Sequence, residues 1–107
     1  MGLFSRTKGT TAGDVAERLA ARSVVVIDVR EPGEWRRGHI KGSQNIPLTR
    51  LVRGVPKLPA DKAIVTVCAS GHRSAAAART LTRAGYSVEN LQGGIRAWSR
   101  AGLPLSR

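Results

Sequence analysis

Two short runs of hydrophobic residues, at residues 24–27 and 64–67, are continuous rather than alternating with charged residues. Every residue in both runs is β-branched, which favours strands over helices. Strands that are apolar on both faces are typical of parallel sheets covered by helices on both sides. Residues 88–91 form a third candidate strand, and residues 45–47 form a shorter extended piece.

Segments with helical spacing separate these strands. Residues 15–21 place apolar side chains on one helical face, after a capping box formed by Thr11 and Asp14. Residues 74–84 include four successive alanines and end at Gly85. Shorter helices are expected after Glu31 and Pro32, in residues 48–54 and in residues 95–101. The alternation predicts an α/β fold, with a parallel sheet and helices on both faces.

The length of 107 residues fits one domain, and no internal repeat or linker divides it. We expect residues 1–9 to form a flexible N-terminal tail and residues 10–107 to form the domain. No apolar run approaches the ~20 residues that a membrane span requires. The first ten residues also lack the apolar stretch of a secretory signal. These patterns predict a cytoplasmic protein that binds no membrane.

The formal net charge is +11, from 18 basic and 7 acidic residues. The basic residues are scattered along the chain, and few aromatic residues are present to stack on bases. This distribution argues against a nucleic-acid interface and indicates a solvated basic surface. Such a surface attracts anionic substrates and would suit an acidic partner protein.

The chemistry of the chain centres on Cys68, its only cysteine, which directly follows the second predicted strand. A short loop entering a helix turns its backbone N–H groups toward one point and forms a cradle for anions. Gly71 permits a tight bend in this loop, and Arg73 supplies a cation. The N–H groups of the cradle and the cation both lower the pKa of a thiol, and the resulting thiolate is a nucleophile. His72 adds a donor that becomes cationic at acidic pH.

Other polar and aromatic residues receive structural interpretations. Asp28 ends the first predicted strand, where a carboxylate can cap the next helix or bond the loop after Cys68. His39 is interpreted as structural, and Trp35 and Trp98 as core residues. A metal site combining His39 with the cysteine and histidine of the loop would have too few ligands.

Three segments together resemble the signatures of the rhodanese homology family. Residues 28–47 resemble the first signature, an Asp-x-Arg followed by Gly-His-Ile-x-Gly and Asn-Ile-Pro. Residues 67–74 resemble the active-site loop, and residues 91–104 resemble the closing signature. The similarity extends over residues 10–105 and implies a rhodanese-like fold with a five-stranded parallel sheet.

The resemblance implies a sulfurtransferase in which Cys68 alternates between a thiol and a persulfide. Sulfane sulfur would pass from thiosulfate or a persulfide donor to cyanide or a thiol acceptor, with no metal or organic cofactor. The residues expected to bind substrate follow the cysteine: Ala69, Ser70, Gly71, His72, Arg73 and Ser74. Supporting roles are expected for Asp28, Arg30 and His39.

One position departs from the family members that are suited to thiosulfate. These members often carry a second basic residue directly after the cysteine, where this chain has Ala69. The preference for thiosulfate is therefore in doubt. Two alternatives also remain open. Related phosphatases use Cys-x5-Arg, whereas this loop is Cys-x4-Arg, and a persulfide carrier delivering sulfur to a partner protein would need the same Cys68.

Overall fold

The two β-branched runs form adjacent inner strands of a sheet with five strands. The computed structural model describes residues 8–107, and every neighbouring pair of strands in the sheet is parallel. The order across the sheet is β1-β5-β4-β2-β3. The strands are β1 (Lys8–Thr10), β2 (Val24–Asp28), β3 (Gln44–Asn45), β4 (Ala63–Val67) and β5 (Val88–Leu91). The predicted α/β fold with a five-stranded parallel sheet is confirmed.

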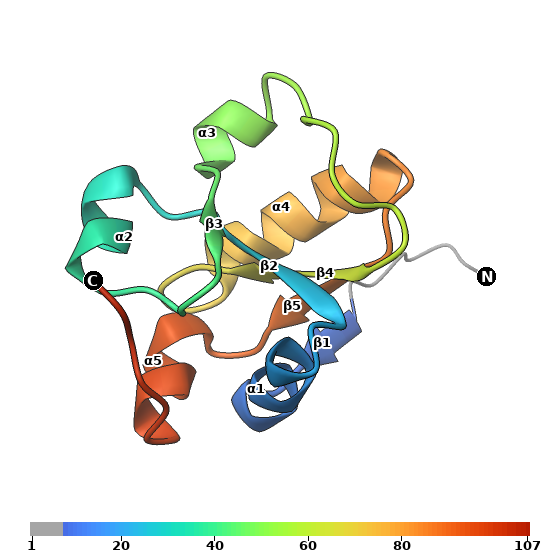
Figure 1. Cartoon of the computed structure of the whole chain (residues 1–107). Coiled ribbons are helices and arrows are strands. Elements are labelled where there is room, and N and C mark those ends of the chain that lie inside the picture. The colour runs from blue at the N-terminus through green and yellow to red at the C-terminus, as the bar shows by residue number, and fades with distance from the viewer. Residues whose placement is uncertain (1–7) are drawn as a thin grey trace.

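Helices cover both faces of this sheet, as predicted. Figure 1 shows α3 and α4 on one face and α1 and α5 on the other. The short α2 follows β2 and lies toward the carboxyl ends of the strands. The bounds are α1 (Ala12–Ala20), α2 (Pro32–Arg37), α3 (Leu48–Leu51), α4 (His72–Arg83) and α5 (Gly94–Arg100).

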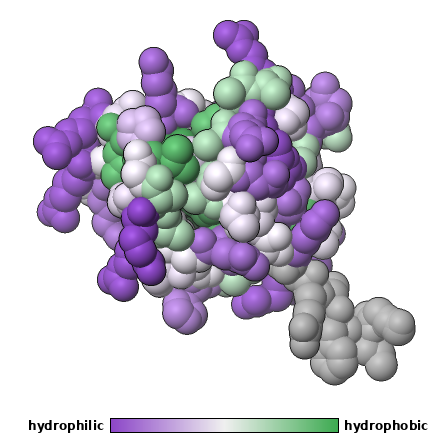
Figure 2. All heavy atoms as spheres, turned by 90° about the horizontal axis from the view of Figure 1, so that it is seen from below, coloured by the Kyte–Doolittle hydropathy of each residue, from purple (hydrophilic) through white to green (hydrophobic). Residues whose placement is uncertain are grey.

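The core consists of two apolar clusters, one on each face of the sheet. Successive strand residues point to opposite faces, so Ile64 packs with α3 and α4, and Val65 packs with α1 and α5. Trp98 is 4% exposed and belongs to the second cluster, as predicted. Cys68 belongs to the first cluster. On the face seen in Figure 2, hydrophilic side chains lie mainly around the outline, and hydrophobic residues are exposed at several places between them.

The first strand lies where the sequence predicted a tail. Lys8 and Gly9 belong to β1 and pair with Glu89 and Asn90 of β5, so any tail ends by residue 7. The rest of the expected tail, residues 1–7, lies outside the described residues. The hydrophobic pattern gave no sign of β1, because Thr10 is its single buried residue.

Two helices begin earlier than the apolar spacing predicted. Helix α1 begins at Ala12, where the side chain of Thr11 accepts a hydrogen bond from the amide of Asp14 at 3.2 Å. This is one half of the predicted capping box; the Asp14 carboxylate accepts instead from the Thr10 hydroxyl at 2.9 Å. Helix α4 begins at His72, within the loop that follows Cys68. None of the helices in the described part of the chain is long and apolar enough to cross a membrane.

Candidate active site

The thiol of Cys68 lies at the carboxyl end of the central strand β4. Cys68 is only 1% exposed and faces the side of the sheet that α4 covers. Its sulfur accepts a hydrogen bond from the amide of Gly71 at 3.0 Å and another from the hydroxyl of Ser74 at 3.3 Å. The sulfur is thus buried, but it is surrounded by donors.

The start of α4 supplies these donors because Gly71 bends the chain sharply. Gly71 has a φ of 109°, a conformation that residues with a Cβ rarely adopt. The first hydrogen bond within the helix runs from the amide of Ala75 to the carbonyl of Gly71 at 3.2 Å. The amides of residues 72–74 therefore have no acceptor inside the helix, and the positive end of its dipole faces the loop.

These donors determine the protonation state of the thiol. Burial raises the pKa of Cys68, because a charged sulfur is poorly solvated there. Hydrogen bonds from the Ser74 hydroxyl and from the amides of Ser74, Gly71 and Ser70 act in the opposite direction and outweigh it, so the pKa is lowered. The arrangement favours a thiolate, which is the nucleophilic form of cysteine.

A second helix holds the outer side of the same loop. The amide of Ile95 in α5 donates to the carbonyl of Cys68 at 2.8 Å, and the amide of Arg96 donates to the carbonyl of Ala69 at 3.2 Å. Any Cβ at Gly94 would overlap with these two loop residues, so only glycine fits there. This role of Gly94 was not predicted, although two successive glycines between a strand and a helix are a visible signal in the sequence.

Arg73 has a partner that the sequence did not predict. Its guanidinium forms two parallel hydrogen bonds with the Glu34 carboxylate of α2, at 2.7 and 3.0 Å. Arg73 is the main cause that lowers the pKa of Glu34 to about 2; burial opposes this effect, and the Glu31 amide adds to it. The pair therefore stays ionised at neutral pH and joins the start of α4 to α2.

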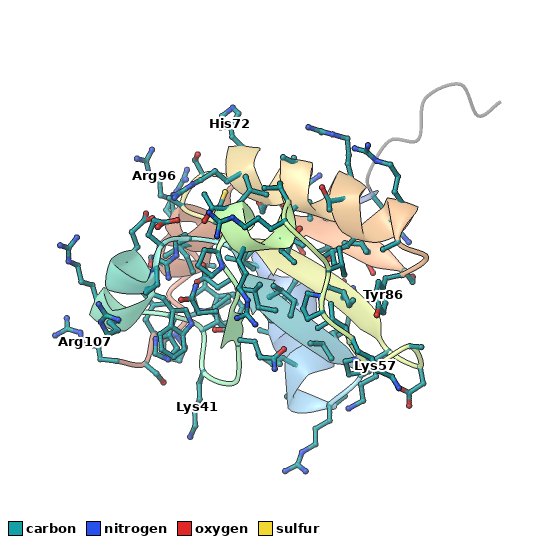
Figure 3. All side chains as sticks on the ribbon, turned by 90° about the horizontal axis from the view of Figure 1, so that it is seen from above. Lys41, Lys57, His72, Tyr86, Arg96 and Arg107 are labelled. Atoms are coloured by element: carbon teal, nitrogen blue, oxygen red, sulfur yellow. The ribbon has the colours of Figure 1, made fainter. Side chains whose placement is uncertain are left out.

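The remaining loop side chains lie away from the sulfur. His72 is exposed, and its Nδ1 lies 3.3 Å from the hydroxyl of Ser70, which is exposed as well. Figure 3 shows His72 pointing outward from the first turn of α4. Ala69 is half-buried and takes part through its backbone.

Asp28 and Arg30 form a buried ion pair beside the loop. They are 1% and 6% exposed, and Arg30 Nη2 lies 2.7 Å from Asp28 Oδ2. Arg30 also donates to the carbonyl of Gly38, and Asn45 donates to the backbone carbonyls of both paired residues. The first signature of the sequence thus ties α2 to β2 and β3, and the Asp28 carboxylate bonds Arg30 rather than the loop after Cys68.

His39 anchors the C-terminal segment to the end of α2. Its backbone exchanges two hydrogen bonds with Ser106, and its Nδ1 donates to the carbonyl of Trp35 at 2.8 Å. Trp35 was predicted in the core, but it is half-buried: it stacks on His39 and lines a groove of about 360 Å³ at the edge strand β3. Within residues 8–107, no three metal-ligating side chains gather at one place.

Known proteins of similar sequence and structure share this arrangement of elements. A sequence model described as "Rhodanese-like domain" matches residues 11–101. A protein from Allochromatium vinosum named "Sulfurtransferase" is 38% identical over 93 residues, which cover 85% of this chain and 87% of that protein. The probable adenylyltransferase/sulfurtransferase MoeZ of Mycobacterium tuberculosis is 43% identical over 88 residues, which cover 79% of this chain but only 22% of that longer protein.

A solved structure gives the same result for the fold. The crystal structure of a rhodanese-related protein from Thermoplasma volcanium matches with a TM-score of 0.86 and 36% identity, over 92% of this chain and 97% of that one. The family model covers most of the chain, and the Allochromatium relative is similar over 85% of it. The chain therefore belongs to the family of rhodanese-like domains.

Proposed function

We propose that this protein is a sulfurtransferase that carries sulfane sulfur on Cys68 as a persulfide. The observation that carries the proposal is the set of donors on the sulfur, the Gly71 amide and the Ser74 hydroxyl. They favour a thiolate inside a loop whose amides can also bind an anionic outer sulfur. Membership of the rhodanese-like family and the name of the Allochromatium relative support the same role in sulfur transfer.

The reaction has two displacement steps. In the first, the Cys68 thiolate attacks the outer sulfur of thiosulfate or of a persulfide, and the sulfur–sulfur bond of the donor breaks. Sulfite or a thiolate leaves with the electron pair, and Cys68 holds the sulfur. In the second, cyanide or an acceptor thiolate attacks that outer sulfur, so thiocyanate or a new persulfide departs and the Cys68 thiolate returns.

The surrounding residues divide into two proposed roles. Backbone amides from Ala69 to Ser74 hold the transferred sulfur or the donor, with the Ser74 hydroxyl beneath the Cys68 sulfur. Asp28, Arg30 and His39 act at a distance, because they fix β2, β3, α2 and the C-terminal segment around the loop.

Substitution of the cysteine tests the proposal. Cys68→Ser should abolish formation of thiocyanate from thiosulfate and cyanide, because a serine has no sulfur to form a persulfide and its hydroxyl is a weak nucleophile at neutral pH. The wild-type protein, treated with a persulfide donor, should gain the mass of one sulfur atom on Cys68. Circular dichroism and urea unfolding would show whether the variant is folded. If a folded Cys68→Ser protein kept most of the activity, the proposed mechanism would be wrong.

A phosphatase is the alternative function for a loop with this cysteine, and it would hydrolyse phosphate esters. The loop has one residue fewer between Cys68 and Arg73 than a Cys-x5-Arg loop, and its arginine is already paired with Glu34. Both features suit a single outer sulfur better than a tetrahedral phosphate. Hydrolysis of a chromogenic phosphate ester by the wild-type protein, lost in Cys68→Ser, would favour the phosphatase.

A persulfide carrier for an acidic partner protein is the second candidate, and the surface charge near the loop favours it. Arg96 and His72 are exposed next to the cradle, and Figure 3 shows both pointing away from the ribbon. Discharge of loaded Cys68 by an acidic peptide with one cysteine should slow about 2- to 10-fold in Arg96→Glu. The matched control is Arg83→Glu, at the far end of α4. Dithiothreitol serves as the uncharged acceptor. If the rate of discharge by the acidic peptide, relative to that by dithiothreitol, were the same in the wild type and both variants, a charged docking site would be excluded.

A further inference from the structure

The charge of Arg73 is neutralised before any substrate arrives. Its guanidinium makes a bidentate pair with Glu34, and the two side chains are 38% and 33% exposed. The same Glu34 carboxylate accepts from the amide of Glu31 at 3.1 Å, so its own helix also holds it in place. With a pKa of about 2, lowered mainly by Arg73, Glu34 keeps its negative charge throughout the working pH range.

Arg73 is the only arginine or lysine in this loop. Its sequence from Cys68 to Ser74 contains one arginine and one histidine, and Ala69 occupies the position next to the cysteine. The histidine, His72, points outward and contacts Ser70 rather than the sulfur. A donor that enters the cradle therefore meets backbone dipoles but no unpaired cation from the loop.

Donors differ in the charge that they bring to such a site. Thiosulfate carries two negative charges and approaches a thiolate, so the reacting group holds three negative charges in a confined space. A persulfide donor brings one charge or none at its reacting end. Because the loop itself supplies no unpaired cation, its own opposition to the repulsion in the first case comes from amide dipoles. The exposed Arg96 beside the cradle belongs to α5 and is unchanged in the variants compared below.

We propose that Glu34 determines donor specificity, because it neutralises Arg73 and thereby disfavours thiosulfate relative to persulfide donors. The inference rests on the proposed sulfur transfer through Cys68 and adds the class of donor. The Glu34 carboxylate bonds Arg73 and the Glu31 amide rather than the sulfur, so it would act as a specificity-determining residue through Arg73.

The experiment measures loading of Cys68 without any acceptor. Rate constants for persulfide formation are determined by rapid quenching and mass spectrometry, with thiosulfate and with cysteine persulfide. Their ratio is the readout, because a partly unfolded variant loses both rates equally and the ratio stays the same. Glu34→Gln keeps the size of the side chain and one acceptor oxygen for Arg73, but it removes the negative charge and one of the two hydrogen bonds to the guanidinium. It should raise the thiosulfate-to-persulfide ratio about 2- to 10-fold, the range for part-exposed charges.

Two further variants isolate the cause. Glu31→Gln removes the same charge from the start of α2, but Glu31 forms no ion pair among the described residues. Its ratio should equal that of the wild type. In the double variant Glu34→Gln/Arg73→Gln the released cation is gone, and the ratio should return to the wild-type value.

Each unfavourable outcome has a distinct meaning. A ratio unchanged in Glu34→Gln, or raised equally in Glu31→Gln, would overturn the role of Glu34. A ratio that stays high in the double variant would overturn the role of Arg73. Wild-type protein that neither donor loads would instead refute sulfur transfer through Cys68. Ala69→Arg is the positive control, because it adds an unpaired cation next to the cysteine and should raise the ratio by itself.

Discussion

The environment of Cys68 combines two opposing influences on one atom. Burial to 1% exposure disfavours the thiolate, while the amides of the loop and the Ser74 hydroxyl favour it. Ser74 is itself fully buried, and its carbonyl accepts a hydrogen bond from the Thr66 hydroxyl at 2.9 Å. This bond helps to fix the backbone of Ser74 beside the sulfur, to which the Ser74 hydroxyl donates.

Ser74→Ala should therefore raise the pKa of Cys68 and slow its alkylation near neutral pH by up to about tenfold. Alkylation by iodoacetamide, followed across pH values, would show the midpoint move upward. Ser70→Ala is the matched control, because the Ser70 hydroxyl contacts His72 and not the sulfur. Identical profiles for the two variants would show that the backbone amides alone set the acidity.

Two helix N-termini meet at the cradle and act on its two sides. Helix α4 directs amides toward the sulfur, and α5 directs amides toward the carbonyls of Cys68 and Ala69. The side chain of Asn90 in β5 adds a third support, donating to the carbonyl of Gly71 at 3.3 Å. The loop is therefore held from several elements rather than by its own sequence.

Gly94→Ala should disrupt this arrangement, because a methyl group would overlap with the loop backbone and the position has a φ of 60°. We expect a loss of about 1–3 kcal/mol in the free energy of unfolding, measured with urea, and slower loading of Cys68. Gly13→Ala in α1 provides the comparison, because a methyl group added there would meet no atom within 4 Å. That variant should be stabilised by about 0.5–1 kcal/mol. Equal stability of Gly94→Ala and the wild type would contradict the close contact between α5 and the loop.

The elements that the sequence revealed are those with strong local signals. Continuous β-branched runs predicted β2 and β4, and the position of Cys68 after β4 predicted the cradle. The pair between Glu34 and Arg73 was not predictable, because the residues lie 39 positions apart and either could face solvent. Strand β1 escaped for a related reason: Lys8 and Gly9 are exposed, and pairing with β5 rather than burial holds them.

Ion pairs join distant parts of the whole molecule. Arg18 of α1 binds Glu89 of β5 at 2.7 Å, and Arg73 of α4 binds Glu34 of α2 at the same distance. Among the described residues, four of the seven acidic side chains form ion pairs: Glu34 and Glu89 pair with these distant arginines, and Asp14 and Asp28 pair with arginines close in sequence. The net charge is already +11, so the positive charges repel one another at neutral pH. Protonation of the seven acidic side chains in acid would increase this repulsion.

Stability should therefore fall in acid, and Glu34 should account for part of the loss. Its pKa is about 2 in the folded protein, below its ordinary value of 4.5. A carboxylate with a lowered pKa stabilises the fold fully above its ordinary pKa, and this contribution is lost as the pH falls through the folded value. Glu34→Gln should be less stable than the wild type at pH 6, and the difference should shrink from about pH 4.5 toward pH 2. Urea unfolding at pH 6, 4 and 3 measures it, and a constant difference would show that the charge of Glu34 is not involved.

The main-chain origin of the cradle has a consequence for how the protein can evolve. Most substitutions change side chains but leave amides in place, so the groups that hold the sulfur survive mutation at Ser70 and His72. Both side chains are exposed on the loop, where they would face a donor or acceptor in the proposed reaction. These two positions can therefore change which molecules are accepted while Gly71 and Ser74 preserve the nucleophile. If Cys68 transfers sulfur as proposed, a library randomised at residues 70 and 72 should yield variants with altered sulfur donors that still load Cys68.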